Sequence, residues 1–286
     1  MVELTPEFCD RHYNFMTPEM IGKLLGELDQ RSKDIRATLR GDLNVRYGPG
    51  EMQTLDLFHP RQPNGALLVF IHGGYWAFAD KDQFSYPAAG FLAAGVGFAA
   101  INYALVPQVR IDEQIEQCRT AIAFLYRNAP AFGFDPERLY VSGHSAGGHL
   151  ASMVMLTDWP SWQPGLPLAL VKGGLTISGL HDLEAIRRTA ALNAVLRLDE
   201  ASAAALSPVR QSPAPAVPLY TAVGGRENVE FRRQTTMLNE SWQSVLKRSL
   251  VMPDDDHFSI LDRFGDGRSE FFKMTIAMMG LAARGH

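Results

Sequence analysis

The stretch Leu139-Tyr-Val-Ser-Gly-His-Ser-Ala-Gly-Gly-His-Leu-Ala151 decides the predicted fold. Residues 138–142 are rich in strand-forming side chains and predict a buried strand, whereas residues 147–157 predict a helix. Between them lies a G-x-S-x-G pattern, Gly143-His-Ser-Ala-Gly147. A strand, a sharp turn and a helix in this order are typical of a nucleophile elbow, which holds a serine at the tip of the turn.

The two glycines of this pattern have a steric explanation. In so tight a turn, the residues two before and two after the serine must lack a Cβ atom, which accounts for Gly143 and Gly147. Ser145 would then stand at the N-terminus of the following helix, where backbone N–H groups and the helix dipole favour developing negative charge. We therefore predict that Ser145 is a nucleophile.

Strand and helix patterns alternate on both sides of this stretch, with short connections. Strands are expected at residues 55–59, 66–71, 97–103, 172–178, 217–223 and 249–252, and helices at 82–94, 112–128, 229–246 and 268–283. This alternation predicts an α/β fold in which a mostly parallel central sheet has helices on both faces. Residues 1–40 are expected to form a helical cap, and residues 180–212 short helices of a cap insertion. Since no linker stands out, residues 1–286 are expected to form one domain.

A serine nucleophile needs a general base and an acid that orients the base. In this architecture the chain order is serine, acid, histidine. Of the eight histidines, His257 follows the last expected strand, within Pro253-Asp-Asp-Asp-His-Phe258, where a loop at the carboxyl edge of the sheet is expected. His181 also follows the serine, but its place in the expected insertion favours a surface or cap role. We predict His257 as the base.

The acid is expected after the penultimate strand, within Val223-Gly-Gly-Arg-Glu-Asn-Val-Glu-Phe231. Glu227 comes first in the loop and is favoured. Glu230 remains an alternative, although it would fall in the first turn of the next helix, where an acid already has a structural reason to be. The three aspartates Asp254–Asp256 adjoin His257, but residues so close in sequence rarely present a carboxylate to the ring. A solvated acidic loop is the favoured interpretation of these three.

The segment Ile71-His-Gly-Gly-Tyr-Trp76 follows the expected strand at residues 66–71. Two successive glycines let the backbone approach a substrate oxygen and direct N–H groups at it. We predict an oxyanion hole formed by the N–H groups of Gly73, Gly74 and Ala146. His72 is expected to be a structural hydrogen-bonding residue that shapes this loop.

Aromatic side chains near these motifs are weaker candidates for the substrate pocket. Tyr75, Trp76 and Phe78 follow the oxyanion glycines and are predicted to line it. Trp159 and Trp162 lie just after the elbow helix and are further candidates. Ligand sites are largely apolar with a few polar anchors, so such walls would suit an aromatic substrate.

No sequence motif for a cofactor or metal is found. Gly95-Val-Gly-Phe-Ala-Ala100 matches a dinucleotide fingerprint, but its glycines end an expected helix and begin a strand, which is the reverse of the required order. The sequence contains no P-loop, HExxH or CxxC motif. We expect neither a cofactor nor a metal.

Composition limits the classes of partner and compartment. Lys and Arg number 27 and Asp and Glu 31, a net charge of −4, which argues against a nucleic-acid binder. There are two cysteines, too few for a disulfide framework. The N-terminal residues lack the apolar region of a signal peptide, and the longest apolar stretch is shorter than the about 20 residues of a membrane span. We expect a cytoplasmic protein with a small-molecule substrate and no nucleic-acid or membrane partner, and a homodimer as the default assembly.

These motifs together resemble the α/β-hydrolase superfamily and, within it, the animal and fungal kynurenine formamidase (arylformamidase) family. The resemblance places the triad acid on Glu227, where the family usually has aspartate. Hormone-sensitive-lipase-like esterases are also similar, but they usually carry a third glycine where this chain has Tyr75. The resemblance rests on His72-Gly-Gly-Tyr-Trp76, Gly143-His-Ser-Ala-Gly-Gly-His-Leu-Ala151, Ser178-Gly-Leu-His-Asp-Leu-Glu184, Glu227-Asn-Val-Glu-Phe-Arg-Arg-Gln234 and Asp256-His-Phe258.

The resemblance and the residues lead to one main hypothesis and two alternatives. The main hypothesis is a serine hydrolase that cleaves an aryl formamide such as N-formylkynurenine, or a related amide, through an acyl-enzyme on Ser145. His257 would be its base and Glu227 its acid. The first alternative is a short-acyl carboxylesterase, which differs only in the leaving group. The second is a non-catalytic binding member of the fold, which the complete set of three residues disfavours.

Overall fold

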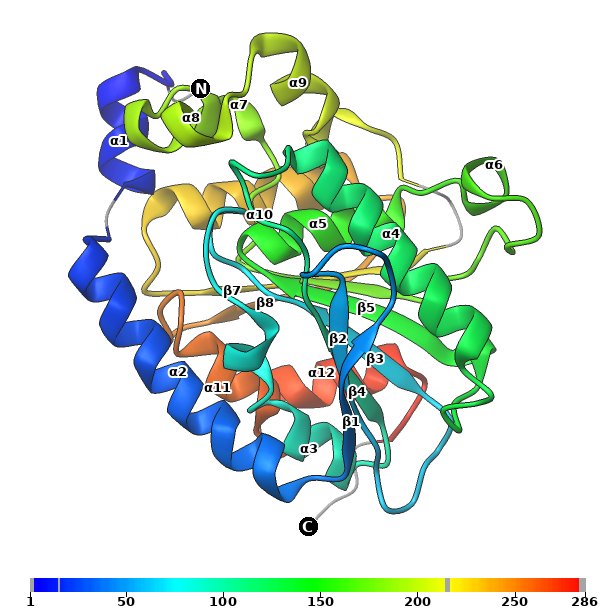
Figure 1. The fold of residues 1–286 in the computed structure, drawn as a ribbon. Helices are drawn as coiled ribbons and strands as arrows, with labels where there is room; N and C mark the ends of the chain where they lie inside the picture. Colours follow the sequence, from blue (N-terminus) through cyan, green and yellow to red (C-terminus); the bar gives the residue numbers. More distant parts are fainter. Residues whose placement is uncertain (1–2, 15, 214–216, 283–286) are drawn as a thin grey trace.

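The structure, a computed structural model, describes residues 3–14, 16–213 and 217–282. Its strands are β1 (Gly41–Arg46), β2 (Thr54–Phe58), β3 (Leu67–Ile71), β4 (Gly97–Ile101), β5 (Leu139–His144), β6 (Gly174–Ile177), β7 (Leu219–Gly224) and β8 (Leu246–Met252). They form an eight-stranded sheet in the order β1-β2-β4-β3-β5-β6-β7-β8 (Figure 1). The pairs β1–β2 and β2–β4 are antiparallel, and all other pairs are parallel. The predicted α/β fold with a mostly parallel sheet is confirmed.

Helices cover both faces of this sheet. The helical segments are α1 (Pro6–Tyr13), α2 (Pro18–Thr38), η1 (Lys81–Phe84), α3 (Ala88–Ala93), α4 (Ile111–Asn128), η2 (Pro136–Arg138), α5 (Ala146–Met155), α6 (Trp159–Trp162), α7 (Leu183–Arg187), α8 (Ala190–Leu196), α9 (Glu200–Ala205), η3 (Pro208–Arg210), α10 (Val229–Ser241), α11 (Ile260–Gly265) and α12 (Glu270–Met278). Figure 1 shows α4, α5 and α10 on one side of the sheet and α3, α11 and α12 on the other. Within the described residues, no helix combines the length and apolar character needed to cross a membrane.

The central strand β3 explains why its sequence is apolar throughout. Successive side chains of a strand point to opposite faces, so a strand covered on both faces has no polar side. Val69 and Ile71 belong to the core cluster that includes residues of α4 and α5. Leu68 and Phe70 belong to the second cluster, with residues of α3, α11 and α12.

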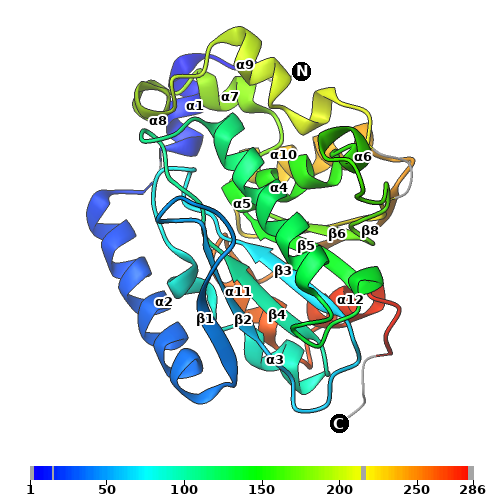
Figure 2. The same cartoon turned by 45° about the vertical axis from the view of Figure 1, so that its right-hand side comes forward.

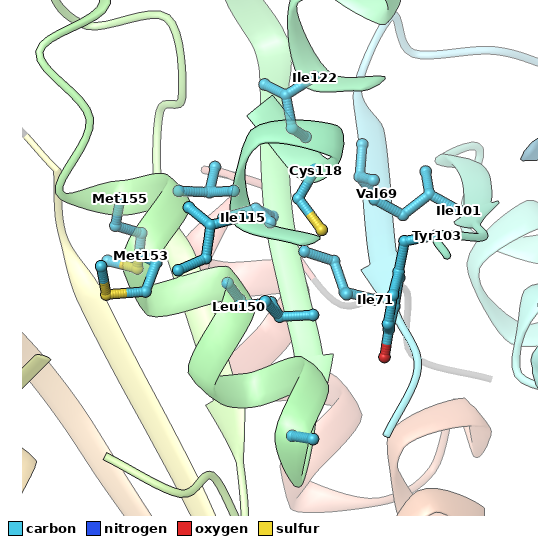
Figure 3. Close-up of a cluster of buried hydrophobic side chains, with 14 of the residues drawn as sticks. Val69, Ile71, Ile101, Tyr103, Ile115, Cys118, Ile122, Leu150, Met153 and Met155 are labelled. Carbon is cyan, nitrogen blue, oxygen red and sulfur yellow. The ribbon is translucent and has the colours of Figure 1, made fainter. Parts of the chain in front are cut away.

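Helix α4 packs on the sheet through the face that its sequence predicts. Ile115, Cys118, Ile122 and Leu125 are all buried in the first core cluster. Figure 3 shows the side chains of Ile115, Cys118 and Ile122 in the same cluster as residues of the neighbouring strands. The spacing of these residues puts them on one side of a helix, which is why the sequence identified this face.

Two of the predicted helices are wrong in their extent. The helix expected at residues 82–94 is divided into η1 and α3, because Pro87 has no N–H group to continue a helix across the junction. The helix expected at 229–246 ends at Ser241, and β8 begins at Leu246 rather than at residue 249. The side chains of β8 are mostly exposed or half-buried, so its first residues carry no strand pattern.

Other differences lie at the edge of the sheet and at the C-terminal end. Strand β1 was not predicted, because its residues are exposed except for half-buried Val45 and show no apolar alternation. The helix expected at 268–283 spans Glu270–Met278, and residue 283 lies outside the described residues. The short α11 was also not predicted.

The elements expected to form caps are helical in the structure. Residues 180–212 form α7, α8, α9 and η3, which confirms the short helical pieces predicted there. Figures 1 and 2 both show α1 beside α7 and α8, while α2 runs along the flank of the molecule. Helix α1 contacts α7, α8 and α10, and α2 contacts η1. Two N-terminal helices are therefore attached to different parts of the fold.

Candidate active site

The predicted strand–turn–helix around Ser145 is present between β5 and α5. Ser145 adopts a positive φ of 56°, a conformation that a non-glycine residue rarely adopts. A Cβ atom on Gly143 would lie 2.1 Å from the carbonyl oxygen of Gly147. A Cβ atom on Gly147 would lie 2.1 Å from the carbonyl oxygen of Ile71. Only glycine fits at either position, as the sequence predicts.

Ser145 stands at the N-terminus of α5 and only 4% of its surface is exposed. Its hydroxyl makes no capping hydrogen bond to the helix, although serine at this position commonly does. The backbone N–H of Ser145 donates to Ile177 O at 2.9 Å, which ties the turn to β6. The hydroxyl is thus placed at a helix N-terminus without being used to cap it.

The structure brings His257 and Glu227 together. His257 Nδ1 lies 2.8 Å from Glu227 Oε2, and the side chain of Glu227 is fully buried. The other carboxylate oxygen, Oε1, accepts hydrogen bonds from the Gly224 N–H at 2.7 Å and from the Ser178 hydroxyl at 2.5 Å. Both oxygens of this carboxylate are therefore engaged, one by the histidine ring and one by the ends of β6 and β7.

Ser178 was not assigned a role from the sequence. It lies immediately after β6, is fully buried and has a φ of 50°. The available signal was its position at the head of Ser178-Gly-Leu-His-Asp-Leu-Glu184, but the pairing with Glu227 joins residues 49 apart in the chain. Such a contact depends on the packing of neighbouring strands and has no local sequence pattern.

Glu230, the alternative acid, has other partners. It lies in the first turn of α10, as expected, and is fully buried. Its carboxylate pairs with Arg233 at 2.7 Å and accepts a hydrogen bond from the Tyr13 hydroxyl at 2.9 Å. Glu230 therefore connects α10 with α1.

The expectation that Asp254–Asp256 form a solvated acidic loop is wrong for one of the three. Asp255 is buried and pairs with Arg263 at 3.2 Å, whereas Asp254 and Asp256 are exposed. Partial burial opposes ionisation of Asp256, but hydrogen bonds from the Ser259 and Phe258 N–H groups hold the pKa of its carboxyl below the ordinary value. Asp256 thereby shapes the turn that follows it.

The loop after β3 lies against the serine. A Cβ atom on Gly73 would come within 3.1 Å of Ser145 Cβ. His72 Nδ1 lies 2.8 Å from Gly73 O, and His72 Nε2 lies 3.1 Å from Asn102 Oδ1. Burial lowers the pKa of His72, which is fully buried. The expected structural role of this histidine is confirmed, because both ring nitrogens contact groups that shape the loop.

A small cavity brings most of the predicted site residues together. Gly73, Gly74, Ser145 and His257 all line it, and its volume is about 30 Å³. A larger hollow of about 580 Å³, near the start of β1, contains none of these four residues. The remaining lining of the small cavity is His144 together with Met16, Leu24, Leu25, Leu28, Tyr75, Phe78, Ala79, Phe84 and Phe258.

The predicted aromatic residues do not all reach this cavity. Tyr75 and Phe78 line it, but Trp76 does not. Trp76 is fully buried, and its indole N–H donates to His149 Nδ1 at 3.2 Å. Trp159 and Trp162 pack edge to face at 5.6 Å and are also absent from the lining. Tyr75 and Trp76 both have a positive φ, of 46° and 61°, in this loop.

The expected surface position of His181 is wrong. This residue is fully buried, and its Nδ1 lies 3.4 Å from the Ser152 hydroxyl. Burial lowers its pKa to about 3, and burial likewise lowers the pKa of His149 to about 4. Both rings are therefore neutral parts of the interior at neutral pH.

These two histidines predict a loss of stability in acid. The unfolded chain binds a proton near the ordinary histidine pKa of 6.5, whereas folded His149 does so only near 4 and His181 only near 3. The free energy of unfolding should be highest above pH 6.5 and fall as the pH is lowered toward these values. Each unit of difference corresponds to about 1.4 kcal/mol, so we expect a loss of a few kcal/mol. Urea denaturation at several pH values in this range measures the free energy of unfolding. We expect H181N to reduce the slope of that free energy against pH. A free energy that does not change with pH would contradict the prediction.

Metal-binding side chains do not gather in the described parts of the chain. Among those residues, no group of three or more His, Cys, Asp or Glu is arranged to hold a metal ion. Cys9 and Cys118 are both buried and are not joined in a disulfide.

Comparison with known proteins shows the family to which the chain is similar. The BD-FAE family model matches residues 55–161, the part of the chain that holds the loop after β3 and the turn around Ser145. Kynurenine formamidase from Salmo salar is 31% identical over 271 residues, which cover 90% of this chain and 87% of that protein. Esterase LipC from Mycobacterium tuberculosis is 35% identical over 129 residues, 43% of this chain and 32% of that protein.

Solved structures extend the comparison. A protein from Silicibacter sp. TM1040, whose crystal structure is provisionally assigned to a thioesterase, has a TM-score of 0.80 and 31% identity, covering 98% of this chain and all of that one. Esterase B from Lactobacillus rhamnosis, at 18% identity, has the same fold, with a TM-score of 0.70 over 92% of this chain and 96% of its own. The chain belongs to the kynurenine formamidase family of α/β-hydrolases and is a hydrolase.

Proposed function

We propose that Ser145, His257 and Glu227 are the nucleophile, general base and orienting acid of this hydrolase, and that it cleaves an aryl formamide or a related amide. The observation that carries the proposal is the 2.8 Å contact of His257 Nδ1 with Glu227 Oε2. It occurs beside a cavity that His257 shares with Ser145 and the two glycines of the oxyanion loop. A nucleophile, a base held by an acid, and backbone donors around one cavity are the parts that acyl transfer needs.

The proposed reaction has two halves. In the first, His257 accepts the proton of the Ser145 hydroxyl while Oγ attacks the carbonyl carbon of the substrate. The N–H groups of Gly73, Gly74 and Ala146 donate to the oxyanion of the tetrahedral intermediate. His257 then returns the proton to the leaving amine, the carbon–nitrogen bond breaks, and an acyl-enzyme remains.

In the second half, water takes the place of the leaving group. His257 accepts a proton from that water as it attacks the acyl-enzyme, and the collapse of the second intermediate regenerates Ser145 and releases the acid, which is formate for a formamide. Glu227 accepts the hydrogen bond from Nδ1–H throughout. It thereby holds the ring in the tautomer whose Nε2 faces the serine.

A short-acyl carboxylesterase is the second candidate, and the esterases among the relatives favour it. Its chemistry is the same except that an alcohol leaves in place of an amine. A binding protein without activity is the least supported alternative, because the histidine–carboxylate contact has the geometry that catalysis uses.

The proposal also covers the domain organisation, compartment, partners and assembly of the enzyme. We propose that residues 1–286 act as one domain in the cytoplasm on a small molecule, without nucleic acid, and as a homodimer by default. The net charge of −4 supports the proposal that nucleic acid is not a partner.

The test of the amide preference compares 2-formamidoacetophenone with phenyl acetate. Each kcat/KM is divided by the rate of spontaneous hydrolysis of the same compound, because the two bonds differ in intrinsic reactivity. We expect the larger enhancement for the formamide. A larger enhancement for the ester would establish the carboxylesterase and overturn the amide preference.

A further inference from the structure

The carboxylate of Glu227 is held at three points by groups from three parts of the chain. Its Oε2 lies 2.8 Å from Nδ1 of His257, on the loop after β8. Its Oε1 accepts hydrogen bonds from the Gly224 N–H, at the end of β7, and from the Ser178 hydroxyl, just after β6, at 2.7 and 2.5 Å. Only the contact at Oε2 belongs to the proposed triad. The two donors to Oε1 fix the rotation of the carboxylate toward the histidine.

The length of a glutamate side chain makes these two donors important. Glutamate has three side-chain torsions, and the last of them, which rotates the carboxylate, has a broad energy profile. Holding such a side chain in one conformation also costs more rotamer entropy than holding a short one. A single contact at Oε2 would restrain the rotation of the carboxylate only weakly. Donors at both oxygens fix its plane.

The backbone around this carboxylate is held by hydrogen bonds that do not involve the Ser178 hydroxyl. The N–H of Arg226 donates to Asp255 O at 3.0 Å, which joins the loop of Glu227 to the loop of the histidine. The N–H of Ser178 donates to Ala222 O at 2.8 Å, which joins the end of β6 to β7. Removal of the hydroxyl should therefore release the carboxylate while the loops stay in place.

The hydroxyl of Ser178 is committed to this contact. Ser178 is fully buried, and within the described part of the chain the hydrogen-bond partner of its hydroxyl is Glu227. Its backbone has a φ of 50°, a conformation that a non-glycine residue rarely adopts. Such conformations persist at functional sites when the surrounding structure maintains them. Glycine would fit this backbone with less strain, but it would provide no donor to Oε1.

We propose that Ser178 is a positioning residue that orients Glu227 and, through it, the ring of His257. The inference rests on the proposed function and deepens it. With Oε1 held by Ser178 and Gly224, Oε2 stays in place to accept the hydrogen bond from Nδ1–H. The ring then keeps Nε2 directed toward the Ser145 hydroxyl. Ser178 makes no contact with the reacting atoms and acts only through the carboxylate.

The first test is S178A, in which the Cβ atom stays and the hydroxyl is lost. Misplacing a catalytic group by about 1 Å can cost about 100-fold in rate, so we expect kcat to fall about 10- to 100-fold with KM unchanged. The substrate is whichever of 2-formamidoacetophenone and phenyl acetate the unchanged protein hydrolyses faster. The downfield proton resonance of the His257 Nδ1–H should shift as well. An unchanged kcat and an unchanged resonance in folded S178A would overturn the inference.

S178G separates the hydroxyl from the backbone conformation. It lacks the same donor, but glycine adopts a positive φ without strain, so this variant also serves if S178A does not fold. We expect the loss of kcat in S178G to match that in S178A. Full activity of S178G would show that the hydroxyl is not needed for positioning, and the inference would be wrong.

S142A is the matched control for the loss of a buried hydroxyl. Ser142 lies on β5, next to β6, and is fully buried like Ser178, but its hydroxyl donates to Val69 O at 3.1 Å. We expect kcat and the histidine resonance of S142A to stay unchanged. If S142A lost as much activity as S178A, the loss would reflect a general disturbance of the sheet rather than positioning.

A double variant tests whether Ser178 acts through Glu227. Without the glutamate side chain there is nothing to position, so adding S178A to E227A should change kcat by less than about threefold. A further loss of about 10- to 100-fold would show that Ser178 acts by another route, contrary to the inference. Full activity of E227A would contradict the proposed acid, and with it the proposed function. A fully active S178A beside an inactive E227A would remove the inference alone.

Discussion

Replacing Ser145 by alanine is expected to abolish hydrolysis, with kcat falling by about 10⁴- to 10⁶-fold, as for other serine hydrolases that lose their nucleophile. The same variant should lose covalent labelling by a fluorophosphonate. We assign both effects to Ser145 because it stands at the N-terminus of α5 and lines the same cavity as His257. Steady-state kinetics with 2-formamidoacetophenone and mass spectrometry of the labelled protein measure the two effects.

The S145A substitution should leave the fold intact. Alanine keeps the Cβ atom that the turn already accommodates, and the serine hydroxyl makes no capping bond that would be lost. S152A is the matched control, because Ser152 lies on the same helix, is fully buried and donates to Gly148 O at 3.1 Å. If folded S145A were still labelled, or if S152A lost labelling equally, Ser145 would not be the nucleophile.

The second large effect is expected for E227Q. This change removes the negative charge beside His257 Nδ1, 2.8 Å away, and permits the ring to adopt the wrong tautomer. The corresponding change in a serine protease lowers kcat about 10⁴-fold, and we expect a loss of about 10³- to 10⁴-fold for E227Q. Comparing kcat of the purified variant with that of the unchanged protein is the direct measurement.

E230Q is the natural control for E227Q, since it makes the same chemical change three residues later. Glu230 forms a buried pair with Arg233 and accepts the hydrogen bond of Tyr13. Removing one charge of a buried pair destabilises a protein, so E230Q should lower the free energy of unfolding by a few kcal/mol while kcat stays nearly unchanged. A folded E230Q that lost activity while E227Q kept it would reverse the assignment of the acid.

Strong local patterns account for the parts of the fold that could be predicted. Strand β3 is apolar because both of its faces are covered, and α4 shows its buried face through the spacing of Ile115, Cys118 and Ile122. The errors fall where such patterns are absent. The exposed residues of β1 show no alternation, and Pro87 divides a segment whose apolar residues suggested one continuous helix.

In the candidate site, too, the features with a local sequence pattern could be predicted and the others could not. Gly143 and Gly147 identify the elbow through the spacing of the G-x-S-x-G pattern. The atom that excludes a Cβ at Gly143 is Gly147 O, within the same turn, whereas the atom that excludes one at Gly147 is Ile71 O at the end of β3. Trp76 looked equivalent to Tyr75 in the sequence, yet it is fully buried against His149 and only Tyr75 lines the cavity. The direction of a side chain in an irregular loop depends on backbone angles that no simple pattern reveals.

By itself the sequence determined the alternation of strands and helices that gives a mostly parallel sheet, and the elbow. Each of these shows in the sequence as a pattern among a few neighbouring residues. Only the tertiary structure decided that Glu227 rather than Glu230 contacts His257, that Ser178 holds Glu227, and that α2 covers the cavity with leucine side chains. These arrangements join residues that are far apart in the chain, and they exist only because the sheet brings the ends of its strands to one edge.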